Sequence, residues 1–157
     1  AGTNSTLAEP ACAVGRVQLS RLGEFAARRA AIAKRYDAGI RELPGVELLA
    51  GTRGGDVHAN HLYTFRLTAG AEARDFLLGV LIDSGVELQQ RYFPVHLMPE
   101  WRLKSGETKL PVTERVWFGE QVQLPIYPQL SDDLVDHVIT SVRKGLLGGD
   151  AGRAFSR

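Results

Sequence analysis

The sequence predicts an α+β fold, in which helices cover a small antiparallel or mixed sheet of two to four short strands and one long helix lies near the N-terminus. Three observations lead to this prediction. Apolar residues recur every three or four positions in one long and several shorter stretches, which is the spacing of helices packed on one face. Other short stretches alternate apolar and polar residues, as half-buried strands do. Gly or Pro separates most of these stretches.

Length and composition are those of one ordinary globular domain. The chain has 157 residues, 44% of them hydrophobic and 24% charged, with a net charge of +1. We expect one domain over residues 1–147 and a flexible tail over residues 148–157. The small net charge and the lack of an apolar run of about 18 residues argue against nucleic-acid and membrane partners. One cysteine, Cys12, excludes an internal disulfide, and no secretory signal is recognisable, so we expect a cytoplasmic location.

The strongest helical pattern runs from Arg16 to Leu43 and is ended by Pro44-Gly45. Seven of the nineteen basic residues lie on it, but acidic residues are interleaved with them, so a solvated face is favoured over a nucleic-acid interface. The apolar residues of this stretch predict a core stripe: Leu19, Leu22, Phe25, Ile32, Tyr36, Ile40 and Leu43.

The other expected elements are shorter. An irregular glycine-rich stretch over residues 45–60 leads to a strand over 61–67 and a helix over 73–84. A short strand over 86–90 and a loop containing Pro94 and Pro99 follow. Pro111 is expected in the first turn of a helix, and Pro125 confines a strand over 122–126 to a sheet edge or strand end. Ser131 caps the last helix, whose predicted core residues are Leu134, Val135, Val138, Ile139 and Val142.

Residues 91–97, Arg-Tyr-Phe-Pro-Val-His-Leu, carry the side chains best suited to bind a polar, anionic ligand. The planar fork of Arg91 can hold a phosphate or carboxylate, Tyr92 can donate to a hydroxyl, and His96 can donate, accept or transfer a proton. Alternatively, Tyr92 is a core residue and His96 lies in an exposed turn, and the residues alone leave both interpretations open. No metal signature is present, since His58 and His61 would face opposite sides of a strand.

A series of short motifs adds a resemblance to a known family. In chain order they are Gly2-Thr3-Asn4, Leu7-Ala8-Glu9, Ala13-Val14-Gly15 with Gln18-Leu19, Arg29 to Tyr36, His61-Leu62-Tyr63, Asp83 to Glu87, Arg91 to His96, Leu110 to Arg115, and Leu124 to Pro128. Together, over roughly residues 2–146, they resemble the C-terminal part of the DegT-type sugar aminotransferases. Those are dimeric enzymes of fold-type I that use pyridoxal phosphate to aminate nucleotide-linked keto sugars or related cyclitols.

The resemblance implies site residues. Asn4 matches the family asparagine that reaches the cofactor phosphate of the neighbouring subunit, and Tyr92 and His96 match loop residues near the sugar, with Arg91 beside them. Thr6 stands where the family often has an arginine, so one anion contact is missing.

The resemblance also implies an incomplete enzyme. The Schiff-base lysine of the family lies upstream of the Asn4 motif, and the four lysines here, Lys34, Lys104, Lys109 and Lys144, do not match it. Because transamination needs that lysine, we expect a small domain that binds pyridoxal phosphate only with a complementing large domain and not alone. We also expect a fragment or processed chain, whose partner is the large domain or a second copy. The alternatives are a non-catalytic interaction or dimerisation module and a separate enzyme that uses His96 and Arg91.

Overall fold

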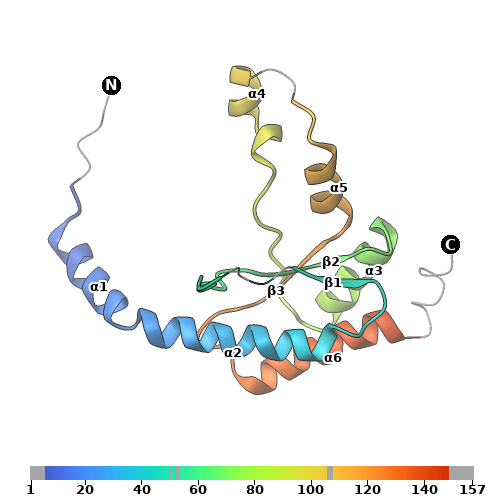
Figure 1. The fold of residues 1–157 in the computed structure, drawn as a ribbon, viewed down its shortest axis with the longest axis horizontal. Coiled ribbons are helices and arrows are strands. Elements are labelled where there is room, and N and C mark those ends of the chain that lie inside the picture. The colour runs from blue at the N-terminus through green and yellow to red at the C-terminus, as the bar shows by residue number, and fades with distance from the viewer. Residues whose placement is uncertain (1–5, 50, 52–53, 106–107, 149–157) are drawn as a thin grey trace.

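The computed structural model describes residues 6–49, 51, 54–105 and 108–148, and it confirms the α+β class. Three strands, β1 (Val46–Leu48), β2 (Tyr63–Leu67) and β3 (Gln121–Leu124), form one antiparallel sheet in the order β1-β2-β3 (Figure 1). The helices are α1 (Glu9–Ser20), α2 (Leu22–Ile40), α3 (Ala71–Asp83), α4 (Pro99–Ser105), α5 (Pro111–Gly119) and α6 (Asp132–Leu147), with a short 3-10 turn, η1, over Val95–Leu97.

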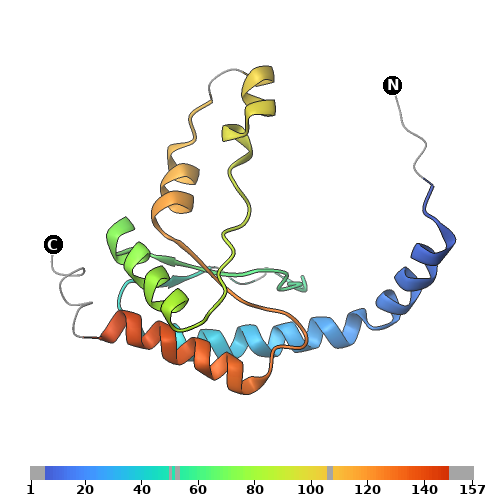
Figure 2. The same cartoon turned by 180° about the vertical axis from the view of Figure 1, so that it is seen from behind.

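The core lies between the sheet and helices α2, α3 and α6 (Figures 1 and 2). On the central strand β2, Tyr63, Phe65 and Leu67 are buried and alternate with half-buried residues, so one face of the sheet contacts the helices. Phe65 pairs with Val122 of β3, which is also fully buried. The chain between α3 and β3 extends away from this core as an arm with α4 at its tip, which Figures 1 and 2 show from opposite sides.

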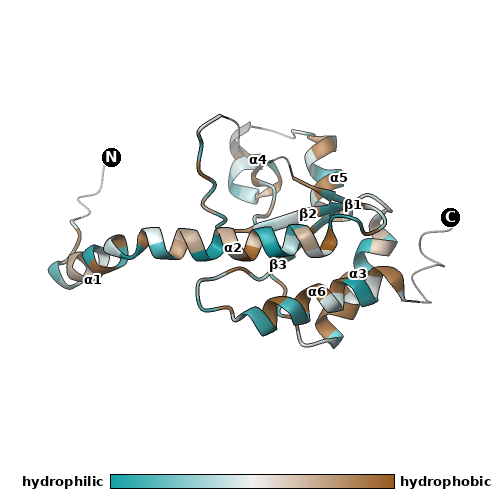
Figure 3. Cartoon of the chain, turned by 60° about the horizontal axis from the view of Figure 1, so that its bottom comes forward, coloured by the Kyte–Doolittle hydropathy of each residue, from teal (hydrophilic) through white to brown (hydrophobic). Residues whose placement is uncertain are grey.

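The long predicted helix is divided in two at Arg21. Its C-terminal part, α2, buries Ile32, Tyr36 and Ile40 as predicted. Its N-terminal part, α1, has no buried residue and projects from the body of the molecule (Figure 3). The predicted core roles of Leu19 on α1 and of Leu22 at the start of α2 are wrong, because 70% and 55% of their surface is exposed. The helical spacing continues through both parts, but only α2 has the sheet and α6 beside it.

The segment over residues 86–90 is extended but is not a strand, which corrects the prediction. It lies beside the outer edge of β3, where Gln90 Nε2 donates to the Gln121 carbonyl at 3.2 Å instead of forming a backbone ladder. The prediction also missed β1 and α4, and it placed His61 in β2 although the strand begins at Tyr63. Pro125 has the predicted effect, because β3 is an edge strand that ends at Leu124.

Helix α6 follows its predicted design. The Ser131 side chain accepts a hydrogen bond from the Leu134 N–H at 3.3 Å, and Val135, Val138 and Val142 are buried, whereas Leu134 is 49% exposed. The predicted tail over 148–157 falls outside the described residues except for Gly148.

Ion pairs join the first turns of α6 to α2. Arg28 Nη1 lies 2.8 Å from Asp132 Oδ1, and Arg35 contacts both Asp132 Oδ2 at 3.0 Å and Asp136 Oδ2 at 2.5 Å. The hydrogen bond from Arg28 lowers the pKa of Asp132, and the charges of Arg28 and Arg35 add to that shift. The network therefore contributes to α2–α6 docking while Asp132 is ionised.

We expect Asp132→Asn to lower the melting temperature slightly at pH 7. Because folding lowers the pKa of Asp132, its contribution is fully present above the unfolded-state value of about 4 and is lost as the pH falls through the folded-state value. The difference between wild type and variant should therefore shrink in thermal melts below pH 4. Asp133→Asn is the control, since Asp133 shares the first turn of α6 but makes no ion pair within the described residues. Equal effects of the two variants would contradict the account.

A second prediction concerns the contact between α6 and α3 at Gly145. A Cβ on Gly145 would lie 2.6 Å from Cδ1 of the fully buried Leu77, whereas a Cβ on Gly79 of α3 would meet no described atom within 4 Å. Both Gly→Ala changes gain roughly 0.5–1 kcal/mol of helix propensity, but Gly145→Ala adds an overpacking cost of about 1–3 kcal/mol. Urea unfolding should show Gly79→Ala stabilised and Gly145→Ala destabilised. A stabilised Gly145→Ala would show that the contact is loose.

Candidate functional site

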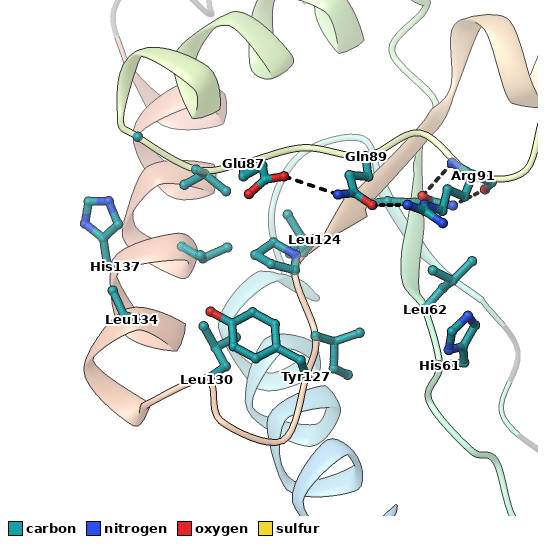
Figure 4. Close-up of a pocket in the computed structure, with 16 residues that line it drawn as sticks. His61, Leu62, Glu87, Gln89, Arg91, Leu124, Tyr127, Leu130, Leu134 and His137 are labelled. Atoms are coloured by element: carbon teal, nitrogen blue, oxygen red, sulfur yellow. Dashed lines mark hydrogen bonds between the residues drawn. The ribbon is translucent and has the colours of Figure 1, made fainter. Parts of the chain in front are cut away.

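An open cavity of about 550 Å³ lies where the extended segment over residues 85–91 faces the chain that follows β3 (Figure 4). Its volume is in the range of small-molecule sites. The floor is apolar and includes Leu124, Ile126, Leu130 and Val138, with Leu134 of α6 on the wall. The polar lining residues are His61, Glu87, Gln89, Arg91, Gln123, Tyr127 and His137.

From Glu87 onward, alternate residues of the extended segment line the cavity, namely Glu87, Gln89 and Arg91, as expected for an extended backbone. Arg91 Nη2 donates to Gln89 Oε1 at 2.6 Å, and Gln89 Nε2 donates to Glu87 Oε1 at 3.2 Å, so the three side chains form a connected row (Figure 4). The Arg91 guanidinium makes no ion pair within the described residues. It therefore keeps N–H groups that can bind an anion at this end of the cavity.

The structure places Tyr92 and His61 at the same end as Arg91. His61 Nε2 lies 3.3 Å from the Tyr92 hydroxyl, and the Tyr92 side chain is exposed. His61 is a site residue that the sequence interpretation missed, because the motif His61-Leu62-Tyr63 was assigned to a strand. The other end of the cavity is marked by His137, whose Nε2 donates to the Ser84 carbonyl at 2.9 Å (Figure 4).

His96 lies apart from this group, on the arm. Its Nε2 is 3.0 Å from Glu114 Oε1 on α5, and because a carboxylate only accepts, this nitrogen carries the hydrogen. Its side chain is 9% exposed. The same Glu114 oxygen accepts the Leu110 N–H at 2.9 Å, and this bond, together with that from His96, lowers the pKa of Glu114. His96 is thus a fixed side chain rather than an exposed turn residue.

Aromatic contacts hold the loop between these two points. The ring of Phe93 meets Trp117 edge to face at 5.2 Å between centroids, and Phe118 at 6.4 Å. The loop between Arg91 and His96 is therefore packed against α5 through Phe93. The structure brings Arg91, Tyr92 and His61 together, and the predicted site residue Asn4 lies outside the described residues.

The cavity has no lysine among its lining residues. The lysines whose side chains the structure describes, Lys34, Lys109 and Lys144, are all exposed, and none lines the cavity. Nor does the described part of the chain group three or more metal-ligating side chains of His, Cys, Asp or Glu. Among the helices of the described residues, none has the length and apolar character needed to cross a membrane.

Comparisons with known proteins identify relatives over nearly the whole chain. The chain is 38% identical over 146 residues to the erythromycin biosynthesis sensory transduction protein EryC1 of Saccharopolyspora erythraea, covering 92% of this chain and 38% of that relative. It is 37% identical over 153 residues to a dTDP-3-amino-3,4,6-trideoxy-alpha-D-glucose transaminase of Micromonospora megalomicea subsp. nigra, covering 94% of this chain and 39% of that protein. The chain thus spans less than two fifths of the length of these curated relatives.

A solved structure shares this fold over part of its length. The crystal structure of DesV from S. venezuelae, in complex with a ketimine intermediate, superimposes with a TM-score of 0.79 at 35% sequence identity, covering 91% of this chain and 38% of DesV. A sequence model described as the DegT/DnrJ/EryC1/StrS aminotransferase family matches residues 1–143. The chain therefore belongs to the DegT/DnrJ/EryC1/StrS aminotransferase family.

Proposed function

We propose that this chain is the C-terminal, substrate-side portion of a pyridoxal-phosphate aminotransferase that aminates a nucleotide-linked keto sugar or a cyclitol. The family match over residues 1–143 supports the reaction class, and the relatives that resemble it include a transaminase of a dTDP-linked amino sugar. Because the chain spans 38% of DesV, the proposal assigns the remaining machinery to protein outside these 157 residues.

One observation carries the proposal that the Schiff-base lysine is supplied from elsewhere. In a family whose chemistry depends on a lysine, the described lysine side chains point into solvent and away from the cavity that holds Arg91. When bound, pyridoxal phosphate supplies an electron sink for the amino transfer. The portion described here would bind and orient the sugar substrate instead, and Asn4 would contact the cofactor phosphate of a neighbouring subunit.

The loop side chains have distinct proposed tasks. Arg91 binds an anionic group of the substrate with the N–H groups left free by Gln89, and the exposed Tyr92 hydroxyl, polarised by His61, contacts a sugar hydroxyl. His96 contributes from the arm, where Glu114 orients its ring through Nε2. The geometry supports substrate binding and orientation rather than proton transfer by this chain.

The exposed apolar residues of helix α1 support the proposal that the chain has a partner. None of its residues is buried, and Leu7 just before it, with Val14 and Val17 on it, leaves well over half of each side chain exposed (Figure 3). A helix of 12 residues is marginal in water without tertiary contacts. We infer that a large domain or a second copy of this chain covers it, and that the assembled protein is cytoplasmic. An interaction module that lost its catalytic partner would share this surface but not the substrate role of Arg91.

The substrate role of Arg91 can be tested in the complete enzyme, with this chain joined to its lysine-bearing part. Arg91→Gln removes the cation but keeps the backbone, so we expect KM for the nucleotide sugar to rise about tenfold, corresponding to one charge-assisted hydrogen bond. KM for the amino donor glutamate should stay unchanged. Lys34→Gln, an exposed charge removal on α2, is the control. A rise in KM for glutamate alone would assign Arg91 to the donor carboxylate, and no change in either would remove Arg91 from the site.

A further inference from the structure

We propose that Gln121 and Gln123 are positioning residues, which hold the backbone of Arg91 and thereby set the placement of the Arg91 and Tyr92 side chains. This inference rests on the proposed function for its kinetic consequence, whereas its structural basis stands on the contacts alone. Neither glutamine is part of the motifs by which the sequence resembles its family.

The contacts form a clamp around the backbone of one residue, Arg91, here named the Gln clamp and defined as the side chains of Gln121 and Gln123. The Arg91 N–H donates to Gln123 Oε1 at 2.8 Å, and Gln123 Nε2 donates back to the Arg91 carbonyl. Gln121 Nε2 donates to the same carbonyl at 2.9 Å. The Arg91 backbone thus has three hydrogen bonds to two side chains of β3.

A carboxamide is suited to this task because it offers a donor and an acceptor on one planar group. At the outer edge of β3, the side chain of Gln123 therefore makes the pair of hydrogen bonds to Arg91 that a strand backbone would make to a neighbouring strand. Gln123 is only 6% exposed, and a buried carboxamide that lost these bonds would carry a desolvation cost. The two-way bond accordingly fixes the distance between β3 and residue 91.

The clamp connects the loop to the central sheet and to α3. Gln123 pairs with Thr64 in the β2–β3 ladder, and the Gln121 carbonyl accepts a hydrogen bond from Arg74 Nε of α3 at 3.1 Å. With the Arg91 backbone fixed to the sheet, its side chain extends along the cavity and Tyr92 reaches His61. A small displacement of such groups has a large effect on substrate orientation.

The first part of the test measures structure and uses this chain alone. Gln123→Met fills the same space without either hydrogen bond, and Gln129→Met, on an exposed glutamine after β3, is the matched control. Hydrogen exchange should show the Arg91 amide losing roughly tenfold protection in Gln123→Met, with core amides of α2 and β2 unchanged. Unchanged exchange at Arg91 would overturn the clamp itself, whatever the function of the chain.

The second part of the test measures kinetics and uses the complete enzyme. In Gln123→Met we expect KM for the nucleotide sugar to rise about 5–10-fold, while kcat and KM for glutamate change less than about twofold, a pattern that a general loss of stability would not produce. Faster exchange at Arg91 with an unchanged sugar KM would overturn the positioning role. A fall in kcat alone, with sugar KM unchanged, would also overturn it.

Gln121→Met keeps the test decisive if Gln123→Met fails to fold. Gln121 is half-buried rather than buried, and its loss removes one of the two bonds to the Arg91 carbonyl, so its sugar KM should rise about 2–5-fold. An unchanged KM in this variant would overturn the proposal. If Arg91→Gln leaves the sugar KM unchanged while Gln121→Met raises it, the clamp acts through Tyr92, and the proposed role of Arg91 fails separately.

Discussion

The contact of Tyr36 with the sheet is the interaction on which the rest of the structure depends. Tyr36 is fully buried, its hydroxyl donates to the Pro125 carbonyl at 2.8 Å, and its ring lies 4.9 Å from that of Tyr63. Tyr63 in turn donates to Asp37 Oδ1 at 2.7 Å, so two neighbouring residues of α2 hold β2 and the end of β3 together. Burial raises the pKa of both phenols, which therefore remain neutral donors. Because β3 is an edge strand, this contact secures the side of the sheet that carries the loop.

From β3 the constraint passes to the candidate site. The Gln clamp holds Arg91 against the strand, and the chain after Pro125 forms the apolar floor of the cavity. On the far side, α5 holds the loop through Phe93 and through the bond between His96 and Glu114. The exposed binding side chains thus stand on a backbone fixed at both ends, which suits a site that orients a ligand rather than one that closes over it.

The sequence predicted those helices and strands whose apolar residues recur at regular spacing. The spacing of Ile32, Tyr36 and Ile40 predicted α2, and alternation around Phe65 predicted β2, because a buried face requires a regular pattern. The same pattern could not show that α1 lacks a partner, since exposure depends on what packs against a helix. Residues 86–90 alternate like a strand, but they are joined to β3 by a hydrogen bond from the Gln90 side chain to the Gln121 carbonyl instead of by a backbone ladder.

The site was only partly predictable for a related reason. Arg91 and Tyr92 could be chosen from their chemistry, but their partners come from segments about 30 residues away in the chain, as with Gln123 and His61. The pair of His96 with Glu114 joins residues 18 positions apart that belong to a loop and to α5. Nothing in local spacing identifies such pairs.

The central claim is that this chain carries the substrate-side loop but not the lysine of the reaction. It is tested most directly by adding pyridoxal phosphate to the chain alone, reducing with borohydride and mapping labelled lysines by peptide mass spectrometry. The account predicts no adduct, or sparse labelling spread over Lys34, Lys104, Lys109 and Lys144. Stoichiometric labelling of one of these lysines would contradict it, because the chain would then hold the cofactor covalently by itself.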